Sequence, residues 1–594
     1  MFSQLEILRG CSPATLRRVM QELPESLDEI YQRALRGIEE AKQEYAHRLF
    51  QCLVASFRPL RVEELADVLA TGEEGSEYDI GLRPEDAQQA LLSTCSSLIT
   101  VVDVDGSPVV QFSHFSVKEF LMSSRLANAR QELSRYHVSP DSGHAILSRA
   151  SLSVLLSLDH QVDENTIENY PLAIYAAQHW VSHAKFGNIS SSTQSLMERL
   201  FDREKPQFAT WIWMHDPDSL SQKPMTAHPT QPEATPLYYA ALCGFPHIVE
   251  HLTKTFPVGV NANGGYHVTP LHAALVKREF DIVRVLLRHG ADINSPGRNG
   301  LRPLHSASSR GDHDAVQLLL ERQADVNIQV DESPLTPLHF SALAGHVQVC
   351  QLLLEKLRLE DGFDSQDEHT GMSLLAASIG GHPAIVQFLL DNGTSLAFRD
   401  DEGQTPLAVA SRYGHVEVVR ILLDRGADVA SRDDDQSTPL NHASKHGHLD
   451  VVHELLAHGA DPNAQGEDFQ TPLHLAAGAG YLGIVQLLLK RGSALDKMNR
   501  SQETPLHLAL CHGKLEVARF LIDHRANLVS KGSHAQAATH LPSSLQVLDL
   551  MELSLEGDLG IERRRASEKT PLHSASGDGK LKVTGELLVN SFSV

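Results

Sequence analysis

The sequence predicts a mainly α-helical protein, most of which is a solenoid of stacked helix pairs. Segments of the Thr-Pro-Leu type recur with steps of 34, 33, 34, 36, 33, 33, 33, 33 and 66 residues, the last step being two periods. A fixed period of this length is typical of stacked repeats. The segments, of which the third and fifth are variants, begin at Thr235, Thr269, Arg302, Thr336, Met372, Thr405, Thr438, Thr471, Thr504 and Thr570.

The unit that begins at Thr405 explains why each period forms two helices. Thr405 is a good N-cap, and Pro406 suits the first helical position, where its missing N–H is not needed. Gly414 ends this helix, and a second apolar stripe at helical spacing then runs to Gly426. Residues 427–437 are polar and predict a solvated loop. Because one unit cannot bury both stripes, we expect neighbouring units to stack.

These units resemble the ankyrin repeat, whose pattern runs T-P-L-H, A-A, G-H, L-L and G-A-D. The Thr471 unit is the fullest match, with T-P-L-H at its start and Leu488 and Leu489 in its second helix. The resemblance implies nine ankyrin units over 235–529 and a protein-binding solenoid without chemistry of its own. Residues 530–569 keep the period but not the pattern, so they are a degenerate repeat or an insertion. Residues 570–594 are expected to be a truncated last repeat.

The N-terminal part predicts helices followed by a β-hairpin. We expect one long helix from about residue 23 to Phe57, two further helices up to Cys95, and a hairpin formed by the β-rich runs within 98–112. Helices followed by such a hairpin indicate a winged-helix module over 1–126.

A helical bridge over 127–221 is expected to follow, with helices at 145–158 and 171–185. The chain's three tryptophans lie in this bridge and are expected to cover the first face of the solenoid. Residues 222–234, which contain three prolines, predict a linker.

Three stretches of the N-terminal part resemble the winged-helix segment that follows the nucleotide-binding NACHT domain in fungal NACHT-ankyrin proteins, which are NLR-like receptors. They read L-P-E-S-L-D-E-I-Y at 23–31, R-P-L-R-V-E-E-L at 58–65 and H-F-S-V-K-E-F-L at 114–121, and the resemblance continues through 171–180. No G-x-x-x-x-G-K-[ST] occurs in the sequence, so the phosphate-binding loop of that family is absent. The resemblance therefore implies the C-terminal part of such a receptor, or a natural short form.

Charge and composition limit the classes of partner. The net charge is −24, and residues 1–126 hold 12 Lys and Arg against 20 Asp and Glu, which disfavours nucleic acid despite the winged-helix pattern. The six cysteines form no C-x-x-C pair, and no apolar run reaches about 18 residues. We therefore expect a reduced, cytoplasmic protein that does not span a membrane, and a nuclear location stays open.

The many histidines do not predict chemistry. Most occupy a repeat position, either the H of T-P-L-H or the residue after the turn glycine, where an imidazole can hydrogen-bond near a helix end. His453, Glu454 and His458 approach the zinc motif H-E-x-x-H, but the spacing of five places the second imidazole off the required face. We predict no catalytic residue, no metal, no cofactor and no small-molecule substrate.

The loop tips between units are the candidate binding surface. Acidic residues recur there as Asp401, Asp434, Asp435 and Glu467, and Phe469 adds an aromatic edge. These residues predict a contact with a protein partner that has a basic surface, although the same acids also suit a purely solvating role. Separately, Ser567 follows an Arg-Arg-Ala sequence typical of a basophilic kinase site.

Together these features predict a non-catalytic protein-interaction scaffold, or the recognition arm of an NLR-like intracellular receptor. One alternative is a free-standing ankyrin adaptor. A less favoured alternative is an enzyme with an unrecognised site in 1–234, because the sequence offers no paired acid and base and no phosphate motif there.

Overall fold

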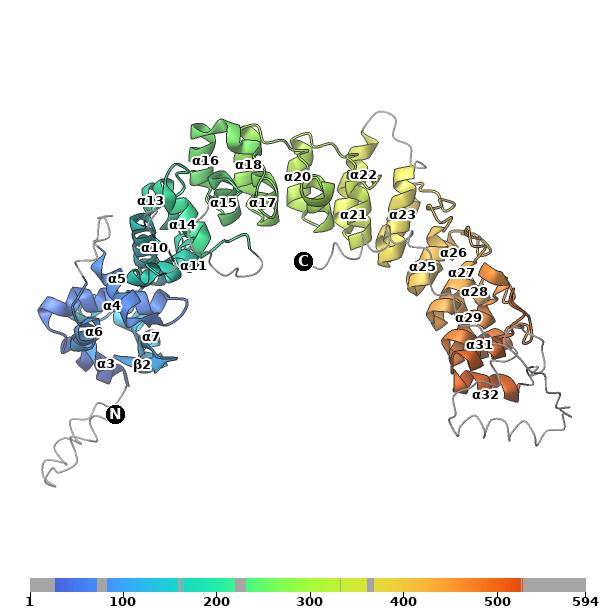
Figure 1. Cartoon of the computed structure of the whole chain (residues 1–594), viewed down its shortest axis with the longest axis horizontal. Helices are drawn as coiled ribbons and strands as arrows, with labels where there is room; N and C mark the ends of the chain where they lie inside the picture. Colours follow the sequence, from blue (N-terminus) through green and yellow to red (C-terminus); the bar gives the residue numbers. More distant parts are fainter. Residues whose placement is uncertain are drawn as a thin grey trace, which may run out of the picture. The chain divides into compact units, whose positions relative to one another are not determined.

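The computed structural model describes residues 27–71, 83–158, 162–163, 165–187, 189–219, 231–331, 333–359, 368–524 and 526. The chain divides into two compact units, Met1–Asp461 and Pro462–Val594, and each is treated by itself. Figure 1 colours the chain in sequence order and labels many of its helices. Among the described helices, none is long and apolar enough to cross a membrane.

Among its described residues, the N-terminal region of the first unit contains five α-helices around a small sheet. The helices are α3 (Leu27–Arg36), α4 (Gln43–Ala55), α5 (Val62–Ala70), α6 (Ala87–Cys95) and α7 (Phe115–Leu121). The prediction of one long helix up to Phe57 was wrong. The helix ends at Arg36, because Gly37 and a 3₁₀ turn at Glu40–Lys42 separate α3 from α4.

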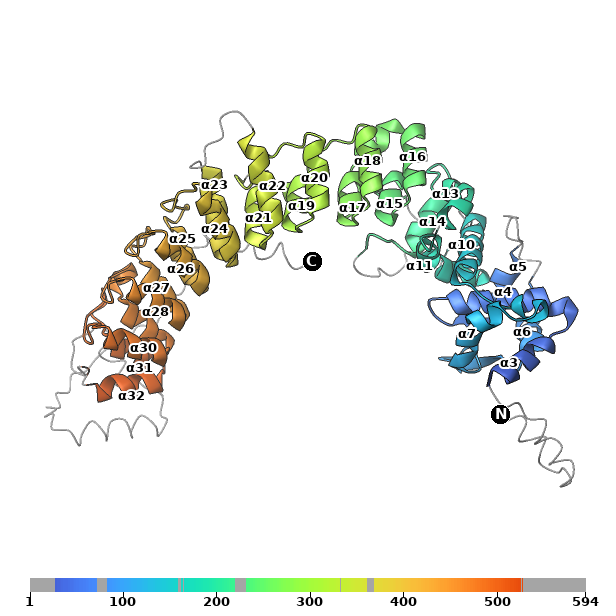
Figure 2. The same cartoon turned by 180° about the vertical axis from the view of Figure 1, so that it is seen from behind.

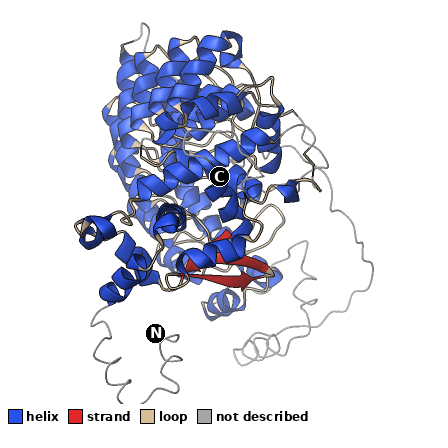
Figure 3. Cartoon of the chain, turned by 90° about the vertical axis from the view of Figure 1, so that its left-hand side faces the viewer, coloured by secondary structure: helices blue, strands red, loops and turns tan. Residues whose placement is uncertain are grey.

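A three-stranded antiparallel sheet completes this region, shown in red in Figure 3. Its strands are β1 (Leu60–Arg61), β2 (Ile99–Val104) and β3 (Ser107–Phe112), in the order β1-β3-β2. β2 and β3 form the predicted hairpin, with Val102 opposite Val109. Val110 on the central strand is fully buried, so the sheet packs against the helices through β3.

The helices that follow carry the aromatic residues predicted to meet the solenoid. They are α8 (Ser124–Ala127), α9 (Gln131–Ser134), α10 (Pro140–Ser157), α11 (Leu172–Ala184), α12 (Ile189–Ser192), α13 (Gln194–Leu200) and α14 (Pro206–Met214). The Trp180 ring stacks on Phe245 of the first repeat at 5.3 Å between centroids, and meets the Trp211 ring edge-on at 5.1 Å. The Trp211 indole N–H donates to the Ala177 carbonyl over 3.2 Å. The Trp180–Phe245 contact joins the bridge to the first repeat, and the other two contacts hold Trp180 and Trp211 in place within the bridge.

Seven helix pairs follow in the first unit, and Figure 2 shows them side by side in chain order. The first helices pack on one another in series: α15 (Pro236–Cys243), α17 (Pro270–Val276), α19 (Pro303–Ser309), α21 (Pro337–Ala344), α23 (Glu368–Gly380), α25 (Pro406–Tyr413) and α27 (Pro439–His446). Their second helices are α16 (Pro246–Thr255), α18 (Phe280–Arg288), α20 (His313–Glu321), α22 (Val347–Arg358), α24 (Pro383–Asp391), α26 (Val416–Asp424) and α28 (Leu449–Ala457).

Thr-Pro pairs set where the first helices begin. In the Thr405 unit the threonine hydroxyl accepts from the Ala408 N–H, and Pro406 is the first helical residue. The Met372 unit has Ser373 in place of this proline, and its helix α23 begins five residues before Ser373, at Glu368. Without the proline ring, the helix can extend backwards towards the loop.

The second unit contains two further pairs among its described residues. They are α29 (Pro472–Ala479) with α30 (Leu482–Lys490), and α31 (Pro505–Cys511) with α32 (Leu515–Asp523). Leu473 and Leu488 are fully buried between these helices. The predictions for residues 530–569 and 570–594, including Ser567, lie outside the described residues, as does the predicted linker apart from 231–234.

Candidate partner-binding surface

In the repeats with a T-P-L-H or R-P-L-H start, a histidine near the start of the first helix holds the loop tip, whereas Ala408 and Asn441 occupy that position in the Thr405 and Thr438 repeats. In the Thr336 unit, the Thr336 N–H donates to His339 Nδ1 over 2.7 Å. The other ring nitrogen, Nε2, lies 2.8 Å from the His369 carbonyl in the segment that leads to the next unit. Because Nδ1 accepts, Nε2 carries the proton and donates to that carbonyl. His339 therefore caps its own helix and ties it to the next unit.

Burial keeps this imidazole neutral. His339 is only 2% exposed. Burial lowers its pKa to about 3, and the nearby His369 and His305 lower it further, while the bond to the His369 carbonyl opposes the shift. Burial also lowers the pKa values of His305 and His474, which occupy the same position, to about 4. These T-P-L-H histidines are thus structural, as the sequence indicates.

A second series of histidines follows the turn residues. Each donates Nε2–H to a carbonyl of the preceding unit: His346 to Ser309, His382 to Leu343, His415 to Ile379 and His448 to Arg412, over 2.8 to 3.0 Å. In the Thr336 repeat, which has both histidines, His339 and His346 bind opposite ends of the first helix to its neighbours. The tips are therefore carried on a rigid support.

One aspartate in each of two adjacent tips is structural and does not face a partner. Asp400 Oδ1 accepts from the Gln404 N–H over 2.7 Å, and burial raises its pKa. Asp433 Oδ1 accepts from the Ser437 N–H over 2.7 Å, and its Oδ2 lies 2.7 Å from His442 Nε2. Asp433 is buried, which the prediction of a solvated loop over 427–437 did not foresee.

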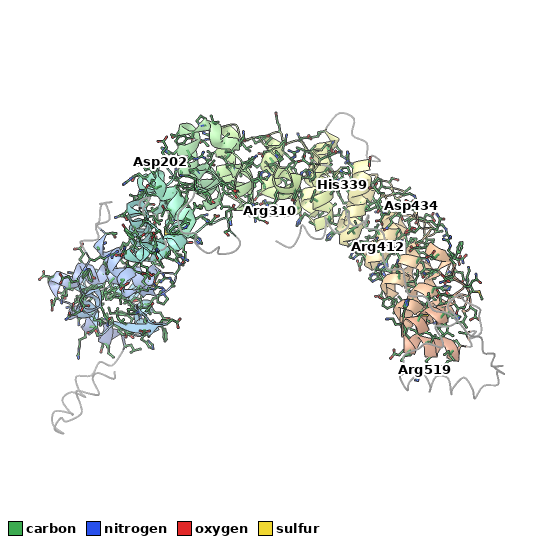
Figure 4. All side chains as sticks on the ribbon, in the orientation of Figure 1. Asp202, Arg310, His339, Arg412, Asp434 and Arg519 are labelled. Atoms are coloured by element: carbon green, nitrogen blue, oxygen red, sulfur yellow. The ribbon has the colours of Figure 1, made fainter. Side chains whose placement is uncertain are left out.

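Asp401, Asp434 and Asp435 are exposed at the same two tips. The tips are joined, because the Asp434 N–H donates to the Glu402 carbonyl over 3.1 Å. Arg399 Nη1 also donates to the carbonyls of Gly403 and Arg432, each over 2.6 Å. Figure 4 labels Asp434 among the side chains of its repeat. The structure thus brings these three predicted residues together on a fixed surface.

Glu467 and Phe469 belong to the second compact unit. Both are exposed, and Phe469 is 56% accessible to solvent. Phe469 and its neighbour Asp468 have positive φ angles of 55° and 51°. The Arg500 N–H of the next tip donates to the Asp468 carbonyl over 2.7 Å. This tip therefore presents a large aromatic side chain from a strained but hydrogen-bonded loop.

Two polar contacts were not foreseen from the sequence. Lys185 Nζ lies 2.6 Å from Glu279 Oε1, which joins the bridge to the second repeat across Gly244. In the bridge, His183 Nδ1 lies 2.7 Å from His144 Nδ1, and its Nε2 lies 2.9 Å from the Tyr175 hydroxyl. Burial lowers the pKa of His183 to about 3, so the imidazole rings in this buried hydrogen-bond network are neutral.

Among the described residues, no three His, Cys, Asp or Glu side chains are grouped as metal ligands would be.

Comparison with known proteins identifies the class of the repeats. Residues 271–320 and 307–354 match the family described as ankyrin repeats (many copies). Residues 373–466 and 459–531 match the family described as ankyrin repeats (3 copies). These parts of the chain are ankyrin repeats, a class that generally binds other proteins through stacked units.

Two curated relatives carry similar sequence. "Azaphilone pigments biosynthesis cluster protein L" of Monascus ruber is 30% identical over 301 residues, which is 46% of this chain and 61% of that protein. "Alpha-latrocrustotoxin-Lt1a" of Latrodectus tredecimguttatus is 38% identical over 60 residues, which is 10% of this chain and 4% of that protein. The chain thus spans less than two thirds of the length of either relative.

Proposed function

We propose that this chain is a non-catalytic protein-binding arm whose ankyrin repeats present the loop tips to a partner. The observation that carries the proposal is that hydrogen bonds join the two tips to each other, through Arg399 Nη1 and the Asp434 N–H. His415 and His448 fix the far ends of the same two first helices to the preceding repeats. A surface held in this way loses little conformational entropy when it binds.

The tips favour a partner with a basic surface. Asp401, Asp434 and Asp435 make no ion pair within the described residues, whereas Asp400 and Asp433 serve the loops themselves. Residues 351–450 hold 17 Asp and Glu against 8 Lys and Arg, so the field around the tips is negative. Exposed carboxylates of this kind steer and orient a cationic partner more than they add affinity.

Charge reversal at the tips tests this proposal. The triple variant D401K/D434K/E467K should lose capture of the partner from an extract of the cells that make the protein, measured by quantitative mass spectrometry. The matched control E321K/E355K/D424K changes the charge equally on exposed positions of the second helices α20, α22 and α26. Equal recovery by wild type and the tip variant rejects the tips as the contact.

We further propose that the N-terminal region is a winged-helix module and that the whole chain serves as the recognition arm of an NLR-like receptor. Helices packed around a three-stranded antiparallel sheet with a β2–β3 hairpin support this reading, as does the resemblance of residues 23–31, 58–65 and 114–121. Reading the gene upstream tests it. A NACHT-type coding stretch there supports the receptor, and a gene without one supports a free-standing ankyrin adaptor.

A further inference from the structure

A small basic island lies within this acidic protein. Residues 266–310 hold seven Lys and Arg against three Asp and Glu, whereas the whole chain has a net charge of −24. Three of the cations gather where helix α17 ends. Lys277 is the C-cap residue of α17, Arg278 follows it, and Arg310 is the C-cap residue of α19.

Arg310 reaches back to the end of α17. Its Nη2 donates to the Leu275 carbonyl over 3.1 Å, although its own backbone belongs to the next unit. The Arg278 N–H donates to the same carbonyl over 3.1 Å. The guanidinium of Arg310 therefore lies at the end of α17, where Lys277 is the C-cap residue, and both Arg310 and Lys277 are exposed.

The two carboxylates in direct contact with this cluster pair with the other cations. Asp312 accepts a forked contact from Arg278, with Nε at 3.1 Å and Nη2 at 3.3 Å. Glu279 lies 2.6 Å from Lys185 and so is engaged across Gly244. Lys277 has no polar partner within the described residues. Lys185 and Arg278 thus each have a carboxylate in direct contact, whereas Lys277 and Arg310 have none within the described residues.

The pKa of the neighbouring His267 reflects burial and the positive charges of this cluster. Burial lowers the pKa of His267, and the charges of Lys277, Arg310 and Arg298 lower it further, while Asp218 acts in the opposite direction. Capping of the helix end explains one cation, because Arg310 already bonds to an α17 carbonyl. Helix capping does not explain why the Lys277 side chain carries its positive charge at this position.

We propose that the end of α17 is a binding site for a phosphorylated side chain of a protein partner, recognised by Lys277 and Arg310. A phosphoserine or phosphothreonine carries about −1.5 to −2 charges at pH 7, which suits two exposed cations that lack an ion pair. Arginine donors suit phosphate oxygens, and a lysine adds a point charge. The large negative net charge disfavours a nucleic acid at the same place. This inference rests on the protein-binding role of the repeats but uses the opposite end of the first helices from the tips.

The test is fluorescence anisotropy of the full chain with the labelled peptide Gly-Ser-Gly-Ala-pSer-Ala-Gly-Ser. Its unphosphorylated twin and a single-stranded DNA octamer are the comparison probes. The phosphopeptide should bind at least about tenfold more tightly than either comparison probe, and the difference should shrink as salt rises. Equal binding of the two peptides, or tighter binding of the DNA, overturns the proposal.

Two variants localise the site. K277E removes no contact within the described residues, so it should fold normally and lose the preference for the phosphopeptide, and K277E/R310A should lose it completely. The control R284A/R288A removes two exposed arginines of α18 in the same unit and should keep it. Equal loss in control and test variants, or full retention by K277E, overturns the assignment. If phosphopeptide binding fails while the tip variant still loses its partner, the phosphate site alone is wrong.

Discussion

His339→Asn should reduce the acid sensitivity of the protein. Another repeat of the same chain already has asparagine at this position, because Asn441 stands where His339 does. Asn441 Oδ1 accepts from the Thr438 N–H over 3.0 Å and from the Thr438 hydroxyl over 2.6 Å. Asparagine can therefore replace the cap made by His339 Nδ1. It cannot titrate, and it loses the bond from Nε2 to the His369 carbonyl.

The magnitude follows from the lowered pKa of His339, which is about 3 in the folded protein against an ordinary value of 6.5. Below pH 6.5 the imidazole is protonated in the unfolded chain but stays neutral in the folded chain. The free energy of unfolding is therefore highest above pH 6.5 and decreases as the pH falls below that value. His339 alone lowers the free energy of unfolding by about 0.2 kcal/mol at pH 7 and by about 2 kcal/mol at pH 5. At pH 7 the variant should be about 1 kcal/mol less stable than wild type, because the hydrogen bond between units is lost.

Urea unfolding followed by helical circular dichroism at pH 7 and pH 5 measures both effects. Between these two pH values, wild type should lose about 2 kcal/mol more than His339→Asn. The other buried histidines titrate alike in both proteins and cancel in this comparison. An equal pH dependence in the two proteins would show that His339 is not a buried neutral cap.

Other substitutions test the packing. Leu473→Ala should cost about 2–5 kcal/mol in urea unfolding, because Leu473 is fully buried, whereas Leu449→Ala, at a position 44% exposed, should cost under about 1 kcal/mol; similar losses would refute the burial. Gly244→Ala places a Cβ at φ +76° against Lys185 and Glu279, while Gly426→Ala at φ +87° meets no atom within 4 Å. Both should cost about 1–3 kcal/mol from backbone strain, with Gly244→Ala the more costly in thermal unfolding. Equal losses would mean that the Lys185–Glu279 contact adds nothing.

Much of the repeat architecture could be read from the sequence, because its determinants are local. Thr-Pro pairs fix where first helices begin, and turn glycines such as Gly414, at φ +81°, fix where they end. The apolar stripes identify buried leucines because helical spacing alone sets which side chains face the neighbouring unit. The family matches over 271–354 and 373–531 confirm this reading, whereas the predicted domain boundaries stay predictions.

The parts that the sequence did not reveal depend on distant partners. In the sequence, Asp433 looks like any other acidic residue of its loop. Its structural role becomes visible only in the structure, where it contacts His442, nine residues further on. The Lys185–Glu279 contact joins residues 94 apart and requires Gly244 to leave room between them. Gly37 interrupts the first helix, although the apolar pattern continues across it. Exposure of Asp401, Asp434 and Asp435 agrees with the predicted surface, but their role in binding stays a prediction.

Hydrogen–deuterium exchange of the chain, alone and with the partner it captures, measures the proposed contact most directly. The account predicts slower exchange at the tips around 399–404 and 432–437 when the partner is bound, with little change along the second helices. Protection confined to the second helices or to the region before residue 231, with the tips unchanged, would contradict it.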